Sequence, residues 1–248
     1  MATLIFSGKI LPERAQVNIS DPIILEIPGD KFRPNFKTQL NIYMNQVIAS
    51  VEVGSKEINI ADIKSELERV VRSFIDLIGY LHGHSYDVEI TSVWSSQDGS
   101  VRVFGIDLPV IDGSKEDRAS RFPDLIPLMC KTPNVQQVLA NLRESMRIPS
   151  DTGFFCYRAI ENVMQGFREE SENKKKAWEH MRESLNLSRE WLEFVKGHAD
   201  GPRHGFYEGM SWDDRQESMK RAWKILDRYF EYLKTGKPLS ENDFPLLK

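Results

Sequence analysis

Hydrophobic residues change their spacing along this chain, and this change constrains its fold more than any other feature. In the first half, Leu40, Ile42 and Met44 alternate with polar neighbours, as in a strand with one buried face. An apolar series in the second half is spaced 4, 3, 4 and 3 residues apart: Met219, Trp223, Leu226, Phe230 and Leu233. That spacing places the series on one face of a helix. The chain is therefore predicted to be an α+β protein.

Residues 1–125 are predicted to form a β-rich domain with one amphipathic helix. A second alternating run predicts another strand: Tyr86, Val88, Ile90 and Trp94. Asp98-Gly99 follows it directly, which predicts a hairpin. The predicted helix has this apolar series: Ile63, Leu67, Val70, Phe74, Leu77 and Leu81. With Asn59 or Asp62 as its cap, it is expected to pack this stripe on the sheet.

Residues 130–235 are predicted to form a five-helix bundle, and residues 236–248 an irregular tail. Several residue types at these positions typically start helices. Thr132 precedes Pro133, Asp151 or Ser150 opens a second helix, and Ser188 caps a later one. The spacing of Ser211 and Asp214 predicts a capping box. Prolines and charges in residues 107–127 place the domain boundary there.

Composition excludes several classes of protein. The net charge is −4, and residues 151–248 carry 17 Lys and Arg against 18 Asp and Glu. Tight binding to duplex DNA is therefore not expected. Apolar runs are too short to cross a bilayer, and no secretory signal is recognised. Cys130 and Cys156 are expected to be at least half-buried, and so few cysteines favour the cytoplasm. No cofactor and no metal ion are expected.

Residues 196–205 read Lys-Gly-His-Ala-Asp-Gly-Pro-Arg-His-Gly and are predicted to form a break between two helices. A histidine titrates near neutral pH, and an arginine offers a fork of donors to a phosphate. Arg203, His204 and His198 are therefore candidate catalytic residues. The candidate binding residues lie in the same segment, on the helix before it and just after it: Asp200, Arg158, Glu161 and Trp212.

The order of these features resembles the HEPN superfamily of helical domains. It comprises a helix with Cys156-Tyr-Arg-Ala-Ile-Glu161, a helix around Trp178, a break that ends in Arg203-His204-Gly205, and a last amphipathic helix. The resemblance implies a homodimer and binding of RNA, a nucleotide or a protein partner. It also implies a role in bacterial defence or toxin–antitoxin systems. Active members cleave RNA without a metal, using an arginine and a histidine about one helical turn or more apart, whereas Arg203 and His204 are adjacent.

Three roles remain open for this segment. It binds RNA, a nucleotide or a partner protein; or it is a metal-independent ribonuclease that uses Arg203 with His204 or His198; or it serves only a dimerisation scaffold. In the scaffold, Gly201-Pro202 forms a turn, His204 caps a helix and Arg203 pairs with Glu161.

A separate pair of histidines, His82 and His84, flanks Gly83. It resembles the zinc-binding strand of the pyruvoyl-tetrahydropterin synthase family, whose site needs three histidines. No histidine precedes His82. We therefore favour a helix that ends at His82, with Gly83 as its left-handed cap.

Overall fold

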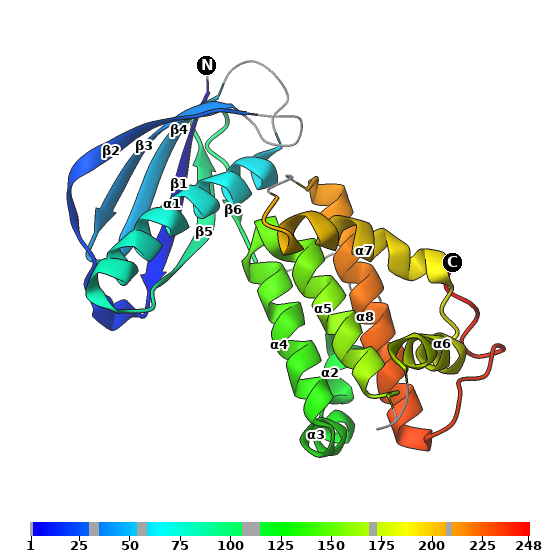
Figure 1. The fold of residues 1–248 in the computed structure, drawn as a ribbon. Helices are drawn as coiled ribbons and strands as arrows, with labels where there is room; N and C mark the ends of the chain where they lie inside the picture. Colours follow the sequence, from blue (N-terminus) through cyan, green and yellow to red (C-terminus); the bar gives the residue numbers. More distant parts are fainter. Residues whose placement is uncertain (1, 30–34, 54–58, 106–114, 169–172, 207–209) are drawn as a thin grey trace. The chain divides into compact units, whose positions relative to one another are not determined.

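The computed structural model describes residues 2–29, 35–53, 59–105, 115–168, 173–206 and 210–248. Its contacts divide the chain into two compact units, Met1–Leu108 and Pro109–Lys248. The described part of the first unit contains an antiparallel sheet, one α-helix and a short 3-10 helix at Glu13–Ala15, and the second unit is helical (Figure 1). This confirms the α+β prediction. The boundary between the units lies within the predicted stretch 107–127, although before residue 125, the predicted end of the β-rich domain. No described helix combines the length and the apolar character needed to span a bilayer.

Six strands form one sheet in the first unit, in the order β2-β3-β4-β1-β5-β6. Their bounds are β1 Ala2–Leu11, β2 Ile19–Ile27, β3 Phe36–Tyr43, β4 Gln46–Val53, β5 Asp87–Ser95 and β6 Val101–Val103. Helix α1, Ile60–His82, lies along one face of this sheet (Figure 1). Its buried apolar residues share a single core with those of the strands.

The predicted alternation holds in β3 and breaks in β5. Leu40 and Ile42 are buried, as predicted. In β5, Ser7 of β1 pairs with Ser92 and Gly8 with Ile90, so Thr91 is an extra residue in the ladder. This bulge shifts the side-chain parity, because each added residue reverses the facing of those after it. Val93 is therefore buried, and the prediction that Trp94 faces the core was wrong.

Helix α1 begins and ends where the sequence predicts. The Asn59 side chain accepts a hydrogen bond from the Ala61 N–H, and Gly83 is the left-handed C-cap with φ +67°. Its buried apolar side chains follow steps of four: Ile63, Leu67, Val71 and Ile75. Each step of four drifts about 40° around a helix, which suits a helix on a twisted sheet. Leu77 and Leu81 are consequently 56% and 67% exposed, against the prediction.

A buried carboxylate joins α1 to the sheet. Glu68 pairs with Lys64 at 2.5 Å and with Arg72 at 3.2 Å. Arg72 also contacts Asp87 and donates a 3.0 Å hydrogen bond to the Val88 carbonyl at the start of β5. Because the Glu68 side chain is only 4% exposed, loss of either cation would leave it insufficiently compensated.

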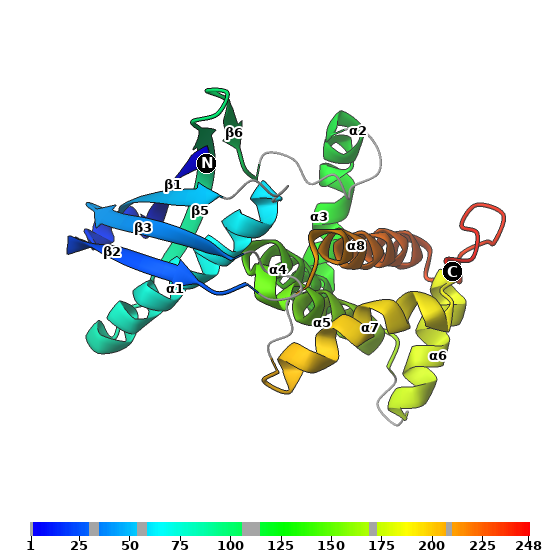
Figure 2. The same cartoon turned by 90° about the horizontal axis from the view of Figure 1, so that it is seen from above.

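The described part of the second unit contains seven α-helices. They are α2 Lys115–Ser120, α3 Phe122–Lys131, α4 Pro133–Arg147, α5 Thr152–Gln165, α6 Lys174–Leu185, α7 Arg189–Arg203 and α8 Trp212–Thr235. The five predicted helices correspond to α4–α8. Helices α2 and α3 were not predicted, because Pro123 and Pro127 suggested a linker. Pro123 instead lies in the first turn of α3, where proline is tolerated. Helices α4, α5 and α8 lie side by side, and α6 and α7 cross them (Figures 1 and 2).

Helix α7 continues through most of the segment that was predicted to be a break. It ends at Arg203, with Pro202 inside its last turn and His204 as the C-cap. Proline donates no N–H, so the carbonyl four residues earlier, that of His198, lacks its usual helical donor. Helix α5 approaches this carbonyl: a Cβ on Gly153 would lie 2.5 Å from the His198 oxygen.

The C-terminal tail is irregular, as predicted, but it is fixed in place. The buried Arg228 guanidinium of α8 donates hydrogen bonds to the carbonyls of Leu185 (2.7 Å), Asn186 (2.8 Å) and Pro245 (2.6 Å). Burial lowers the pKa of Arg228. Arg228 therefore ties the tail and the turn between α6 and α7 to α8.

Replacing Gly153 with alanine should lower the free energy of unfolding of the second unit by about 2 kcal/mol, because the new methyl group would overlap the His198 carbonyl. Gly197→Ala on α7 is the matched control. No atom lies within 4 Å of its added Cβ, so better helix propensity should stabilise the protein by about 0.5 kcal/mol. Chemical denaturation measures both changes. Equal effects would show that the approach of α5 to α7 is not as tight as described.

Replacing Arg228 with methionine should cost about 3 kcal/mol, because three charge-assisted hydrogen bonds are lost. Limited proteolysis should then cut within residues 236–248 before any other site. The control is Arg189→Met, since that side chain is 75% exposed and its change should stay within about 0.5 kcal/mol. If the tail of the Arg228 variant resists protease as well as the wild type, the guanidinium does not hold it.

Candidate functional site

Arg203 and His204 lie at the exposed end of α7. Among the described residues, the structure records no hydrogen bond or ion pair of either side chain. Glu161 pairs with Lys174 of α6, at 3.1 Å between Nζ and Oε1. The Arg203–Glu161 pair considered for a scaffold is therefore not present. The turn expected at Gly201-Pro202 is also absent, because both residues are helical.

His198 takes part in a different set of contacts. Its Nε2 lies 3.9 Å from Oδ1 of Asp214 at the start of α8, and its ring meets the Phe194 ring edge-on at 5.0 Å. The Asp214 carboxylate also accepts a 2.7 Å hydrogen bond from the Ser211 hydroxyl, and the Ser211 Oγ accepts one from the Asp214 N–H, so Ser211 caps α8 as predicted but the reciprocal bond of a capping box is not recorded. His198 thus lies in the contact between α7 and α8, with its side chain 31% exposed.

Trp212 lies at the first turn of α8, where its ring is covered by an arginine. The Arg215 guanidinium carbon lies 5.1 Å from the centroid of the Trp212 ring. Arg215 is buried, and its Nε donates a 3.0 Å hydrogen bond to the Thr152 hydroxyl of α5. These contacts indicate that Trp212 helps to join α8 to α5.

Tyr157 of α5 is the residue around which several predicted site residues gather. Its ring stacks on that of Trp178 of α6, with centroids 6.0 Å apart and planes inclined by 14°. Burial raises the pKa of the Tyr157 hydroxyl; the negative charges of Glu161 and Asp200 raise it further, and the positive charge of Arg203 opposes them. Three predicted positions therefore lie within electrostatic reach of one hydroxyl.

We call this set the Tyr157 cluster: Tyr157, Glu161, Lys174, Trp178, Asp200 and Arg203. Helix α5 supplies the phenol and one carboxylate, four residues apart on one face. Helix α7 supplies Asp200 and Arg203, three residues apart, and α6 supplies the ammonium and the indole. A ring stack and an ion pair join four members of the cluster, and the charges of Asp200 and Arg203 act on the Tyr157 hydroxyl.

Arg158, another predicted site residue, follows Tyr157 directly and is turned about 100° around α5 from it. It is exposed, and its guanidinium lies 5.6 Å from the centroid of the Phe154 ring. It is therefore a neighbour of the Tyr157 cluster and not one of its members.

Tyr157, Lys174 and Trp178 were not among the predicted site residues. The spacing of Tyr157 and Glu161 by four residues could have indicated the first, and the run Lys174-Lys175-Lys176 is a local sign of a basic surface. Nothing local indicates that Lys174 or Trp178 lies beside α5, because α6 reaches α5 only through the fold.

The His82 and His84 rings lie 6.3 Å apart, and Nδ1 of His84 is 2.9 Å from the Tyr86 hydroxyl. In the part of the chain that the structure describes, no group of three or more His, Cys, Asp and Glu is placed to hold a metal ion. Gly83 is the left-handed cap at the end of α1, as predicted.

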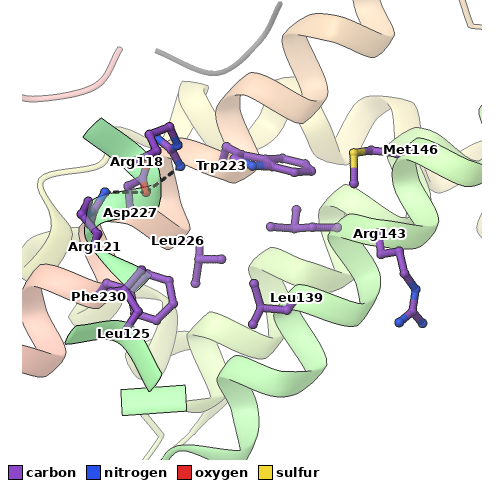
Figure 3. Close-up of a pocket in the computed structure, with 11 residues that line it drawn as sticks. Arg118, Arg121, Leu125, Leu139, Arg143, Met146, Trp223, Leu226, Asp227 and Phe230 are labelled. Carbon is purple, nitrogen blue, oxygen red and sulfur yellow. Dashed lines mark hydrogen bonds and ion pairs between the residues drawn. The ribbon is translucent and has the colours of Figure 1, made fainter. Parts of the chain in front are cut away.

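The sequence analysis also missed a cavity of about 260 Å³ in the second unit (Figure 3). Helices α3, α4 and α8 supply its apolar lining, which includes Leu125, Leu139, Leu142, Met146, Trp223 and Phe230. Arg118, Arg121 and Asp227 also line it, and both arginines bond to this aspartate.

The fold and these sites define a two-unit α+β protein whose helical unit carries a surface cluster and an apolar cavity. Comparison with protein families gave two matches, described as the N-terminal domain and the C-terminal domain of a domain of unknown function (DUF8168), over residues 4–104 and 122–234. The chain is thus similar to this family in both of its units. Neither the curated proteins nor the solved structures gave a match.

The two cysteines should differ in reactivity. Cys156 is buried, and burial raises the pKa of its thiol to about 12. Cys130 is exposed, contrary to the sequence prediction. At pH 8 a thiol reagent should therefore modify one thiol in the folded chain and the second only after denaturation. Rapid modification of both thiols in the folded chain would contradict the burial of Cys156 in α5.

Proposed function

We propose that the Tyr157 cluster binds single-stranded RNA. The observation that carries this proposal is the partly exposed ring stack of Tyr157 and Trp178, flanked by the Lys174–Glu161 pair and within electrostatic reach of the Arg203 charge. Guanidinium and ammonium groups bind phosphate oxygens, and aromatic faces stack on unpaired bases. Proteins that bind single strands commonly combine these two kinds of contact.

The two carboxylates of the cluster favour RNA over DNA. Glu161 and Asp200 are acceptors, and the 2′-hydroxyl of ribose is a donor that DNA lacks. They also offset the positive charge of Lys174 and Arg203, so few phosphates are neutralised. Binding should therefore be moderate in strength and limited to a short segment of RNA.

The order of α5, α6, α7 and α8 supports the resemblance to HEPN domains on which this proposal also draws. As further parts of the proposal, the helical unit forms a homodimer, and the protein acts in the cytoplasm in a bacterial defence or toxin–antitoxin system. These parts come from the resemblance alone.

A metal-independent ribonuclease is a second candidate, favoured by the His198–Asp214 pair. An imidazole with a carboxylate nearby is a common arrangement for a general acid or base, and here Nε2 and Oδ1 are 3.9 Å apart. His198 and Arg203 are five residues apart on α7, which turns them about 140° from each other. A second copy would therefore have to bring an arginine to His198. RNA cleavage that persists in EDTA and is lost in His198→Ala would establish this candidate.

Fluorescence anisotropy with a labelled single-stranded RNA tests the binding proposal. Two phosphate contacts should give a slope of log K against log salt concentration of about −1.4, and Arg203→Ala should reduce it to about −0.7. Arg189→Ala, at the other end of α7, is the matched control and should leave affinity and slope unchanged. Equal losses in both variants, or no binding by the wild type, would overturn the proposal.

The stacking contact can be tested separately. Trp178→Ala should weaken RNA binding by about tenfold, in line with the loss of one stacked base. Trp94→Ala, in the first unit, is its control. An unchanged affinity in Trp178→Ala would remove the aromatic pair from the site.

A further inference from the structure

The cavity between α2–α3, α4 and α8 suggests a binding site that is separate from the Tyr157 cluster. In Figure 3, Leu139, Leu226 and Phe230 converge on one space, whereas the head of Arg143 extends away from it. Most of its lining is apolar, and all of it comes from the second unit: the apolar part from α3, α4 and α8, and Arg118 from α2. The cavity therefore does not depend on how the two units are placed.

Its size limits the ligand. An apolar cavity of about 150 Å³ holds a benzene molecule, and drug-sized ligands occupy about 300 Å³ or more. A cavity of about 260 Å³ lies between these values. It would accommodate an aromatic ring or a short alkyl chain with a small head group.

One edge of the cavity carries a network of ion pairs. Nη1 and Nη2 of Arg118 donate hydrogen bonds to Oδ2 and Oδ1 of Asp227, at 3.0 and 3.1 Å. Arg121 donates to Asp227 at 3.3 Å and to Glu231 at 3.0 Å. Each carboxylate is thus shared, since Glu231 also pairs with Lys234 at 3.0 Å.

Sharing has a chemical consequence. A guanidinium has five N–H donors in a planar fork, so one arginine can donate to two carboxylates at once, as Arg121 does to Asp227 and Glu231. A further carboxylate placed at this edge would gain charge-assisted hydrogen bonds from Arg118 or Arg121. A cation there would instead face two arginines.

We infer that this cavity binds a small arylalkyl or alkyl carboxylate, with its apolar part among Leu139, Trp223 and Phe230 and its carboxylate on Arg118 and Arg121. Asp227 then acts as an internal competitor, because it occupies the donors that the ligand needs. Removing its charge should tighten binding even though it loosens α2 and α3. The RNA proposal and this one rest on different residues, so either can fail alone.

Calorimetric titration of the full chain with 3-phenylpropanoate tests the inference, with 3-phenylpropan-1-ol as the neutral analogue. The acid should bind at least tenfold more tightly than the alcohol. Arg121→Gln removes a positive charge and leaves the apolar lining in place, so it should remove most of the difference in affinity between the acid and the alcohol. No binding of the acid, or equal binding of the two compounds, would overturn the inference.

Three further variants locate the site. Leu139→Trp should fill the cavity and weaken binding of the acid at least tenfold. Leu77→Trp, at an exposed position of α1, should not change it. Asp227→Asn should tighten binding severalfold, as release of a competitor requires. If Leu139→Trp folds by circular dichroism and still binds the acid normally, the ligand lies elsewhere; weaker binding by Asp227→Asn would refute the competition.

Discussion

The close approach of α5 to α7 at Gly153 is the constraint on which the helical unit and its proposed RNA site depend. A side chain at this position would overlap the His198 carbonyl, with 2.5 Å between Cβ and oxygen. Tyr157 follows Gly153 by one turn of α5, and Asp200 and Arg203 follow His198 on α7. The backbone contact therefore sets how near the phenol lies to the charges of α7. Because Pro202 supplies no N–H to the His198 carbonyl, α7 can present that oxygen to α5 without breaking a helical hydrogen bond.

Arginines have two different roles in this molecule, and burial distinguishes them. Arg228 and Arg215 are buried and donate hydrogen bonds to carbonyl or hydroxyl oxygens, so they hold elements together. Arg203 is exposed at the end of α7, and among the described residues the structure records no hydrogen bond or ion pair of its side chain. Glu68 in the first unit is a buried acidic residue with a structural role. Its carboxylate lies in the contact between α1 and the sheet, where Lys64 and Arg72 compensate its charge. The charge of a side chain alone does not distinguish the arginines that hold elements together from the exposed Arg203.

Much of the fold could be predicted because its signals are local. The caps at Asn59, Ser188 and Ser211, the left-handed Gly83 and the alternation in β3 all depend on nearby residues. The bulge at Thr91 could not be predicted, because it exists only in the pairing of β5 with β1. The extension of α7 through Pro202 could not be predicted for a different reason: in the sequence, a proline in the last turn of a helix is indistinguishable from one that ends the helix earlier.

The site could be predicted in part. Glu161, Asp200 and Arg203 were predicted, and their charges all act on the pKa of the Tyr157 hydroxyl. Their centre, Tyr157, resembled an ordinary core residue, and Trp178 and Lys174 come from a helix whose position only the fold determines. His198 and Trp212 were grouped with them because they are close in sequence. His198 lies instead where α7 meets α8, and Trp212 lies where α8 meets α5. The imidazole and Arg203 therefore point in different directions, so one chain alone does not bring them together for cleavage of RNA.

The most direct test of the central claim uses the indole N–H signals of the five tryptophans in a nuclear magnetic resonance titration with single-stranded RNA. After assignment by single substitutions, the Trp178 signal should shift most, because its ring lies in the Tyr157 cluster. The signals of Trp94 and Trp223 should stay in place. RNA binding that leaves the Trp178 signal unmoved, or that shifts Trp94 instead, would contradict the assignment of the RNA site to this cluster.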